Sequence, residues 1–293
     1  MSALKIRDLL LRHGPAHGTQ ATLIEGLELI RVSRPLPTVP ALYPASLCFL
    51  VDGQKRVYFG GEAKTYGHGS LLCCTMPLPV EAEVPHASPE EPVLGLLLSL
   101  DTQTMMETLV ATEATGGLAP GPDAGESTAG LVVCPWDAGL VDAVFRLLQL
   151  LDDPCARQVL SHARLRELYF ALLRDAGRAV RRTFGASRDL GRAFAFLYDN
   201  IAEPLSIDEL ARVAGMSRAV FHRRFKAATT LSPLQFVKAV RLNNAAVMLA
   251  SGMNVAEAAG QVGYNSPSQF SREFSRLYGM APRQWAAVSS VTA

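Results

Sequence analysis

The sequence has few of the features that mark membrane, secreted or disulfide-rich proteins. No apolar run approaches the ~20 residues needed to span a bilayer, and the longest lies around Val93–Leu100. The N-terminal residues alternate between charged and apolar at helical spacing and lack the unbroken apolar stretch of a signal peptide. Only five of the 293 residues are cysteine, an odd number unevenly spread, which indicates no disulfide framework. These absences predict a cytosolic protein with no membrane partner.

The short motifs of several enzyme classes are also missing. The sequence has no nucleophile elbow, phosphate-binding loop or dinucleotide fingerprint. His68 stands alone and His86 lies in a proline-rich stretch, whereas a cupin metal site needs clustered histidines with a carboxylate. Cys73 and Cys74 are adjacent and no CxxC pattern occurs, so we interpret them as buried structural thiols on opposite faces of a strand. We predict no catalytic residues, no metal and no cofactor.

Charge is scarce overall but unevenly distributed. The net charge is +1, yet residues 1–186 carry 16 Lys and Arg against 20 Asp and Glu. Residues 187–293 carry 12 against 7, a net charge of +5. An acidic first part and a basic second part suggest that only the second part meets a polyanion such as nucleic acid.

Residues 20–100 have the pattern of a β domain. Short β-prone runs alternate with proline and glycine, as in an antiparallel sandwich or barrel. Asp52-Gly53 and Gly60-Gly61 are typical hairpin turns. The expected strands are Leu47–Val51, Val57–Phe59, Ser70–Thr75 and Val93–Leu100. A flexible loop is expected between Thr112 and Gly130, where large apolar residues are rare.

Helical periodicity begins near residue 138. The residues Leu140, Val144, Leu148 and Leu151 form an apolar stripe, and a second helix is predicted from Pro154 to about Arg174. Such helices could pack on the β domain or present an apolar seam to a second subunit. We therefore predict dimerisation through residues 138–176 as one of these two alternatives. The Gly- and Ser-containing segment from Arg181 to Arg192 is the expected linker.

The last ninety residues contain an internal repeat. Each copy begins with a predicted helix cap, Ser206 in the first and Asn254 in the second, followed three residues later by glutamate. A glycine then stands where a tight turn needs a residue that tolerates positive φ, Gly215 and Gly263. A second helix follows each glycine. This order is that of the helix-turn-helix unit, whose second helix can enter a DNA major groove.

Beyond the turns the two copies stay in register with an offset of 49 residues. The matched pairs are Phe221 with Phe270, Arg223 with Arg272, Phe225 with Phe274, Pro233 with Pro282 and Gln235 with Gln284. We expect Phe221 and Phe225 to point into the core. No acidic residue occurs between Ser217 and Lys226, so the opposite face can meet phosphates and base edges.

One long helix is predicted between the copies, from Pro233 to Ser251, with Ser232 as its cap and Gly252 as its stop. At 1.5 Å per residue, roughly 18 residues span ~27 Å. One turn of DNA is ~34 Å long. A helix of this length could hold two recognition helices near successive major grooves.

Short motifs run through the segment from Asp199 to Trp285. They are Leu205-Ser-Ile-Asp-Glu-Leu-Ala, Gly215-Met-Ser, Phe221-His-Arg-Arg-Phe-Lys, Ser232-Pro, Arg241, Gly263-Tyr, Ser268-Gln-Phe-Ser-Arg-Glu-Phe and Gly279-Met-Ala-Pro. Through these motifs the segment resembles the AraC/XylS family of bacterial transcription regulators. The N-terminal part is similar to the family's cupin-like effector domain. That similarity is carried by Ser33-Arg-Pro, Val57-Tyr-Phe-Gly-Gly-Glu, Met76-Pro-Leu-Pro-Val-Glu and Ala87-Ser-Pro-Glu-Glu-Pro.

The resemblance implies which residues contact DNA. In the family, base contacts come from the early and middle turns of each recognition helix. The implied DNA-binding residues, with their neighbours, are Arg218, Ala219, His222, Arg223, Lys226, Ser266, Ser268, Gln269, Ser271 and Arg272. Ala219 suits a van der Waals contact with a thymine methyl group. Pro267 falls at a contact position but has no N–H to donate, so it suits the helix start.

We therefore predict an α+β protein with two domains. Residues 1–182 form a β-sandwich or cupin-like barrel with following helices at about 138–182, for effector binding and dimerisation. Residues 187–293 form an all-α DNA-binding domain with helix-turn-helix units at 206–227 and 254–277. The predicted function is transcriptional regulation on a double-stranded DNA operator, modulated by a small molecule of unspecified identity, with a homodimer partner and a contact to RNA polymerase. The alternatives are a cupin-type enzyme fused to a DNA-binding module, or an N-terminal domain that only oligomerises.

Overall fold

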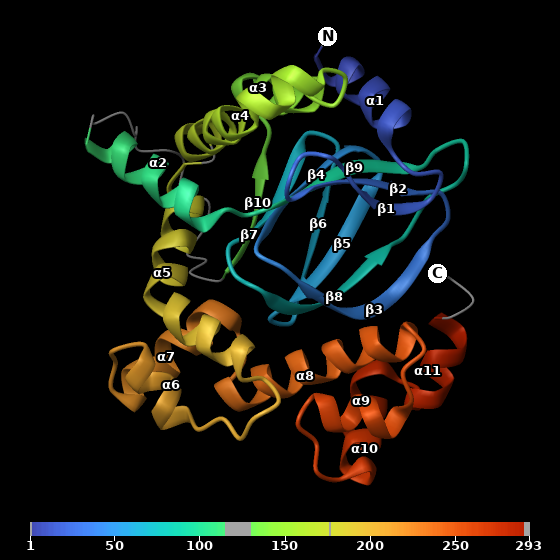
Figure 1. The fold of residues 1–293 in the computed structure, drawn as a ribbon, viewed down its shortest axis with the longest axis vertical. Helices are drawn as coiled ribbons and strands as arrows, with labels where there is room; N and C mark the ends of the chain where they lie inside the picture. The colour runs from blue at the N-terminus through green and yellow to red at the C-terminus, as the bar shows by residue number, and fades with distance from the viewer. Residues whose placement is uncertain (1, 115–129, 176, 290–293) are drawn as a thin grey trace.

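The computed structural model describes residues 2–114, 130–175 and 177–289, and its N-terminal part is a β domain of two antiparallel sheets (Figure 1). The order in the larger sheet is β1 (Gly18–Ala21), β2 (Leu27–Val32), β9 (Val93–Ser99), β4 (Ser46–Asp52), β7 (Ser70–Cys74) and β10 (Leu131–Pro135). The order in the smaller sheet is β3 (Leu36–Tyr43), β8 (Leu78–Val84), β5 (Gln54–Phe59) and β6 (Glu62–Gly67). The predicted antiparallel β domain is confirmed.

The two predicted hairpin turns have different outcomes. Gly60 and Gly61 join β5 to β6, which pair with each other, so that hairpin is confirmed. Asp52-Gly53 joins β4 to β5, but these strands belong to different sheets, so the second hairpin prediction is wrong. β4 pairs instead with β7 and β9. The turn at Gly53 (φ 76°) carries the chain from one sheet to the other, close against Val93.

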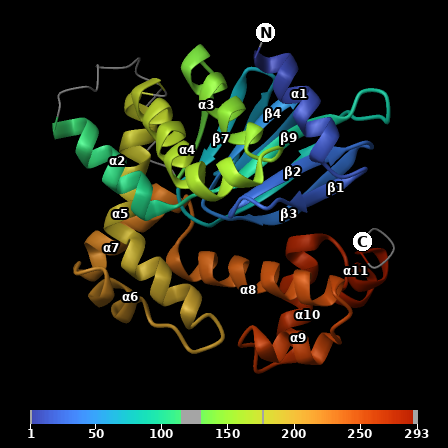
Figure 2. The ribbon, with the colours of Figure 1, turned by 45° about the horizontal axis from the view of Figure 1, so that its top comes forward.

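Helices cover the outer face of the larger sheet (Figure 2). They are α1 (Ser2–His13), α2 (Thr102–Ala114), α3 (Ala138–Gln149) and α4 (Pro154–Asp175). The side chains of Leu140, Val144 and Leu148 are fully buried in the core between these helices and the sheet, and Leu151 is half-buried against it. Of the two alternatives for this stripe, packing on the β domain is correct. The stripe cannot also be the seam of a dimer.

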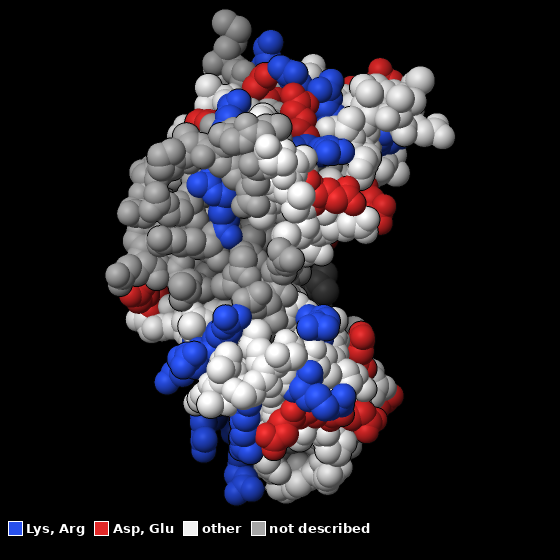
Figure 3. Space-filling view, turned by 90° about the vertical axis from the view of Figure 1, so that its left-hand side faces the viewer, with Lys and Arg blue, Asp and Glu red and all other residues white. Residues whose placement is uncertain are grey.

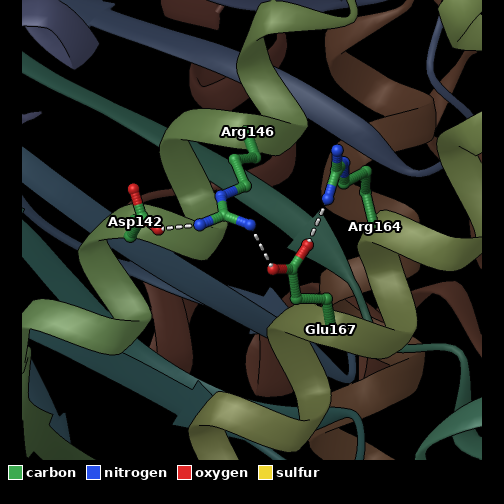
Figure 4. A network of polar contacts seen from close by, with 4 residues as sticks. All are labelled: Asp142, Arg146, Arg164 and Glu167. Carbon is green, nitrogen blue, oxygen red and sulfur yellow. Dashed lines mark hydrogen bonds and ion pairs between the residues drawn. The ribbon is translucent and has the colours of Figure 1, made fainter.

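Ion pairs join α3 and α4 at the surface (Figure 4). The guanidinium of Arg146 contacts Asp142 on its own helix and Glu167 on α4. Arg164 contacts the second oxygen of Glu167 at 2.7 Å. All four side chains are partly exposed, so this network fixes the register of two helices more than it adds to stability.

The expected linker is not a loop. Residues 181–192 lie within α5 (Gly177–Asp199), a helix that runs down from the β domain to the C-terminal helices (Figure 1). Glycine and serine suggested a break, but Leu190, Phe194 and Leu197 are buried at helical spacing and stabilise the helix by packing. The predicted flexible loop at 112–130 falls mostly at 115–129, outside the described residues.

The described residues of the C-terminal part form helices joined by short turns, with no strand among them. Its helices are α6 (Ile207–Val213), α7 (Arg218–Thr229), α8 (Pro233–Ala250), α9 (Val255–Gln261), α10 (Pro267–Tyr278) and α11 (Pro282–Ser289). The caps at Ser206, Ser232 and Asn254 are confirmed, since each side chain accepts a hydrogen bond from the backbone three residues on. Gly215 and Gly263 have φ of 69° and 81°, as the turns require. The two helix-turn-helix pairs are α6 with α7 and α9 with α10.

The β domain and the first helix-turn-helix unit share one core. Buried residues between the two sheets, such as Leu78 and Leu131, belong to the same apolar cluster as Phe194, Phe221 and Phe236. The second unit has a separate core around Phe270 and Phe274. The α8 helix lies beneath the smaller sheet and contacts β3 and β8 (Figures 1 and 2). The sheet therefore lies directly over the helix that joins the two units.

Candidate nucleic-acid interface

The α7 helix presents one polar face and buries the other. Ser217 caps its N-terminus, and Phe221 and Phe225 are fully buried. The side chains of the opposite face are exposed and follow one another at helical spacing. They are Ala219, His222, Arg223 and Lys226. The candidate residues of the first unit are therefore brought together on a single accessible face.

Part of the positive charge on this unit is free to meet a polyanion, since Arg212 pairs with Glu209 at 3.6 Å but some other cations have no such partner among the described residues. In Figure 3, Lys and Arg side chains stand out from the lower part of the molecule, where α6 and α7 lie. Arg223 and Lys226 form no ion pair with any residue that the structure describes. Arg218 differs, because its guanidinium contacts both oxygens of Asp208 at 3.2–3.3 Å. Any phosphate contact by Arg218 must compete with this exposed pair.

The α10 helix has the same architecture with less charge. Phe270 and Phe274 are buried, and Pro267, Ser268 and Arg272 are exposed. Ser271 lies on the same side and is half-buried. Among the described residues, Arg272 makes no ion pair.

Two candidates of the second unit already have structural partners. The hydroxyl of Ser266 accepts a hydrogen bond from the backbone N–H of Gln269 and thereby caps α10. The side-chain amide of Gln269 donates to Glu273 at 3.2 Å. These contacts position the helix, and they leave Ser268, Ser271 and Arg272 as the accessible set.

Glu273 connects α10 to α8. Lys238 of α8 donates to this carboxylate at 2.9 Å, and the hydroxyl of Tyr264 donates to it at 2.8 Å. Burial opposes ionisation of Glu273, but the hydrogen bonds from Lys238, Tyr264 and Gln269 outweigh burial and lower its pKa. The charge next to Arg272 is thus already neutralised by the protein.

A basic residue missed in the sequence lies beside the first unit. Arg192 of α5 reaches the turn before α7, where its guanidinium is 3.4 Å from the Cβ position at Gly215. Together with Arg224 it lines a shallow polar depression next to the N-terminus of α7. Arg192 was not predicted as a DNA-binding residue, because it falls in the segment that was expected to be a linker.

A cleft lies between the smaller sheet of the β domain and the helices α8 and α10. Its volume is about 750 Å³, within the range of small-molecule sites. Phe59 and Val80 line it from the β domain, and Leu231 lines it from the segment after α7. Its charged lining residues are Lys238, Arg276, Glu81 and Glu273, of which Lys238 and Glu273 pair with each other. The sequence could not reveal this cleft, because its walls come from distant parts of the chain.

The histidines and cysteines do not gather into a metal site in the described part of the chain. His68 contacts the carbonyl oxygen of Val51 through Nδ1 at 2.7 Å. Cys73 and Cys74 are buried and pack in different apolar clusters, on opposite faces of β7. Burial raises the pKa of the Cys74 thiol to about 12. These thiols are structural, as expected. None of the described helices has the length and apolarity to cross a membrane.

Comparison with protein families gives two matches along the chain. Residues 23–180 match the model of the AraC-type transcriptional regulator N-terminus, and residues 210–287 match a helix-turn-helix domain. The first of these matches covers more than half of the chain.

Individual relatives match over shorter stretches. The transcriptional regulator MtrA of Neisseria gonorrhoeae is 36% identical over 97 residues, which are 33% of this chain and 32% of MtrA. The transcriptional activator RhaS of Escherichia fergusonii is 30% identical over 152 residues, 50% of this chain and 55% of RhaS. The chain thus spans only about a third to a half of the length of these relatives.

The fold as a whole is similar to that of ToxT from Vibrio cholerae. One ToxT structure has a TM-score of 0.58 at 10% sequence identity, covering 89% of this chain and 97% of ToxT. Another, described with a bound unsaturated fatty acid, has a TM-score of 0.54 at 10% identity over 88% of this chain and 94% of ToxT. At this identity the similarity concerns the fold alone.

Proposed function

The chain belongs to the AraC-type transcriptional regulators, and from that premise we propose that it binds duplex DNA sequence-specifically through α7 and α10. One observation carries the proposal. Equivalent positions of an internal repeat, Arg223 and Arg272, lie on exposed helix faces without ion-pair partners among the described residues. A guanidinium in this setting can bind guanine O6 and N7 in bidentate fashion.

The experiment is selection of bound fragments from genomic DNA by the purified full chain, followed by affinity measurement on the selected duplex. We expect a site with two half-sites about one helical turn apart. Arg223→Ala should weaken binding to that duplex, while Arg283→Ala, an exposed arginine on α11, is the matched control. Failure to enrich any sequence over random DNA would contradict the proposal.

We further propose that a small molecule regulates DNA binding from the cleft between the β domain and α8. The cleft supports this role by its size, its mainly apolar lining and the cationic side chain of Arg276. ToxT, which shares the fold, has been described with a fatty acid bound. The effector expected here is small, with an apolar body and at least one polar group.

A thermal-stability screen tests the effector proposal, because a ligand that binds only the native state raises stability by mass action. Ala239 lines the cleft, so Ala239→Trp should fill it and abolish the stabilisation. Ala256→Trp on the exposed side of α9 is the control and should keep it. Equal stabilisation of both variants would place the ligand elsewhere.

A homodimer and a contact with RNA polymerase complete the proposal. Val159 and Phe170 of α4 are exposed apolar side chains, with 72% and 41% of their surfaces accessible, and they suit a subunit contact. Sedimentation of the full chain tests the dimer. A reconstituted transcription assay on the selected operator tests whether the protein acts on the polymerase.

A further inference from the structure

Thr230 ends α7 in an unfavourable backbone conformation. Its φ is 62°, in the left-handed region, and it is the only residue other than glycine with positive φ in the described part of the chain. Its N–H donates to the carbonyl oxygen of Lys226 at 2.8 Å, so this conformation closes the last turn of the helix. A β-branched side chain is poorly suited to this region, whereas glycine adopts it without steric cost.

The internal repeat shows that a residue without backbone strain can end the equivalent helix. At the offset of 49 residues, the counterpart of Thr230 is Gly279, which ends α10 with φ of 69°. Its N–H donates to Ser275 in the same way, at 2.9 Å. A Cβ atom at Gly279 would meet no atom within 4 Å. The first copy therefore has a threonine with a strained backbone at the position where the second copy has a glycine.

That extra side chain touches the β domain. A Cβ atom built on Gly60, in the turn between β5 and β6, would lie 2.8 Å from the methyl carbon of Thr230. The methyl group therefore packs directly against a glycine that leaves it room. Nearby, the N–H of Gly130 donates to the carbonyl oxygen of Ala228 at 2.8 Å. The end of α7 thus contacts the β domain at two points.

We propose that the Gly60–Thr230 contact couples the β domain to the first recognition helix. With the β5–β6 turn in place, packing on the methyl group holds the left-handed conformation and keeps the last turn of α7 intact. When the turn moves, Thr230 loses its support and relaxes, and the turn that carries Lys226 opens. Persistent backbone strain of this kind requires support from surrounding structure. Gly60 and Thr230 also line the cleft, so an occupant of the cleft would lie beside this contact.

The chain offers a matched pair of variants for the test. Gly60→Ala places a methyl group against Thr230. Gly61→Ala changes the next residue, which also has positive φ (83°) but no atom within 4 Å of the Cβ position. Thr230→Gly removes both the contact and the strain. The effect on DNA affinity rests on the proposed function, so a second measurement that needs no DNA accompanies it.

The measurements are the dissociation constant of the full chain for its selected duplex and amide hydrogen exchange at residues 226–231. We expect Gly60→Ala to weaken DNA binding about threefold or more and to speed exchange of the Thr230 amide. Gly61→Ala should leave both near the wild-type values. In the Thr230→Gly background, Gly60→Ala should have no further effect, because the methyl group it would meet is gone.

Two results would overturn the coupling. One is equal behaviour of Gly60→Ala and Gly61→Ala, and the other is an effect of Gly60→Ala that persists in the Thr230→Gly background. If the chain bound no DNA at all, the proposed function would fail. Hydrogen exchange would still decide whether the β domain controls the end of α7.

Discussion

The guanidinium of Arg241 in α8 donates a hydrogen bond from Nη1 to the carbonyl oxygen of Gly263, at 3.3 Å, in the turn of the second helix-turn-helix unit. The same side chain donates to the carbonyl oxygens of Ile201 and Glu203, just before the first unit, at 2.8 and 2.7 Å. A Cβ atom at Gly263 would lie 2.2 Å from the carbonyl oxygen of Ala202. The guanidinium of Arg241 and the close approach at Gly263 therefore hold the two units in a fixed relative position.

Replacing Arg241 should loosen this arrangement. Lysine keeps the charge but lacks the rigid fork of donors, so Arg241→Lys leaves at least one carbonyl group unsatisfied. We expect the free energy of unfolding to fall by about 1–3 kcal/mol. We also expect the variant to discriminate less between duplexes whose half-sites differ in spacing by one base pair. Urea unfolding and binding to a series of spaced duplexes measure the two effects.

The control for Arg241→Lys is Arg283→Lys, at an exposed site on α11. It should change neither stability nor spacing preference. If Arg241→Lys lost stability but kept the wild-type dependence on spacing, the side chain would support the fold without setting the distance between the units.

The helical repeat could be predicted because its signals are local. A cap such as Ser206, a turn glycine such as Gly215 and a buried Phe221 each depend on a few neighbouring residues. The same is true of the exposed face around Arg223. Side-chain partners within the units were less predictable, and the pairing of Arg218 with Asp208 appears only in the structure.

Contacts between distant parts of the chain could not be predicted from the sequence. No local pattern shows that Gly60 meets Thr230, or that Arg241 bridges the two units. The α5 helix is an intermediate case, because its glycine and serine favour a break while Leu190, Phe194 and Leu197, which are buried, have helical spacing. Sequence patterns describe one element at a time, whereas the cleft and the domain contact depend on how elements pack.

Acid should weaken the ion pair that joins Lys238 of α8 to Glu273 of α10. The folded protein lowers the pKa of Glu273 below its ordinary value of 4.5, mainly through Lys238 and Tyr264. Its stabilising effect is therefore complete above about pH 4.5 and is lost as the pH falls through the lower folded-state value. We expect wild type to be more stable than Glu273→Gln at neutral pH, with the difference shrinking below pH 4.5.

Urea unfolding across this pH range measures the difference between wild type and Glu273→Gln. Glu90→Gln, at an exposed carboxylate for which no ion pair is found in the described residues, should show no such convergence. A constant difference between wild type and Glu273→Gln from pH 7 to pH 3 would mean that ionisation of Glu273 is not the source of the stabilisation.

The apolar stripe of α3 and the exposed face of α4 should respond differently to substitution. Leu148 is 1% exposed, so Leu148→Ala should lower the free energy of unfolding by about 2–5 kcal/mol without changing the oligomeric state. Phe170→Glu on α4 should instead shift any dimer toward monomer at little cost in stability. Sedimentation and urea unfolding of both variants test these assignments. If Leu148→Ala dissociated the dimer and Phe170→Glu did not, the subunit contact would lie on α3 and not on the exposed face of α4.

The two recognition helices should divide the work of DNA binding unequally. The exposed face of α7 carries Arg223 and Lys226, whereas that of α10 carries Arg272, since Arg276 lines the cleft. Phosphate neutralisation supplies most non-specific affinity, so the first helix should dominate it. Lys226→Ala should weaken binding to all sequences alike and reduce the salt dependence. Binding to operator and random duplexes at two salt concentrations measures this effect.

The two arginines should be specific to different bases. A bidentate contact to guanine is worth about 1–3 kcal/mol of discrimination, so Arg223→Ala and Arg272→Ala should each lose discrimination at one base pair. Those base pairs should lie about one helical turn apart, because α8 and Arg241 hold the two units at a fixed distance. Each variant is measured on a set of singly substituted operator duplexes. Loss of discrimination at the same base pair in both variants would show that the two helices do not occupy successive grooves.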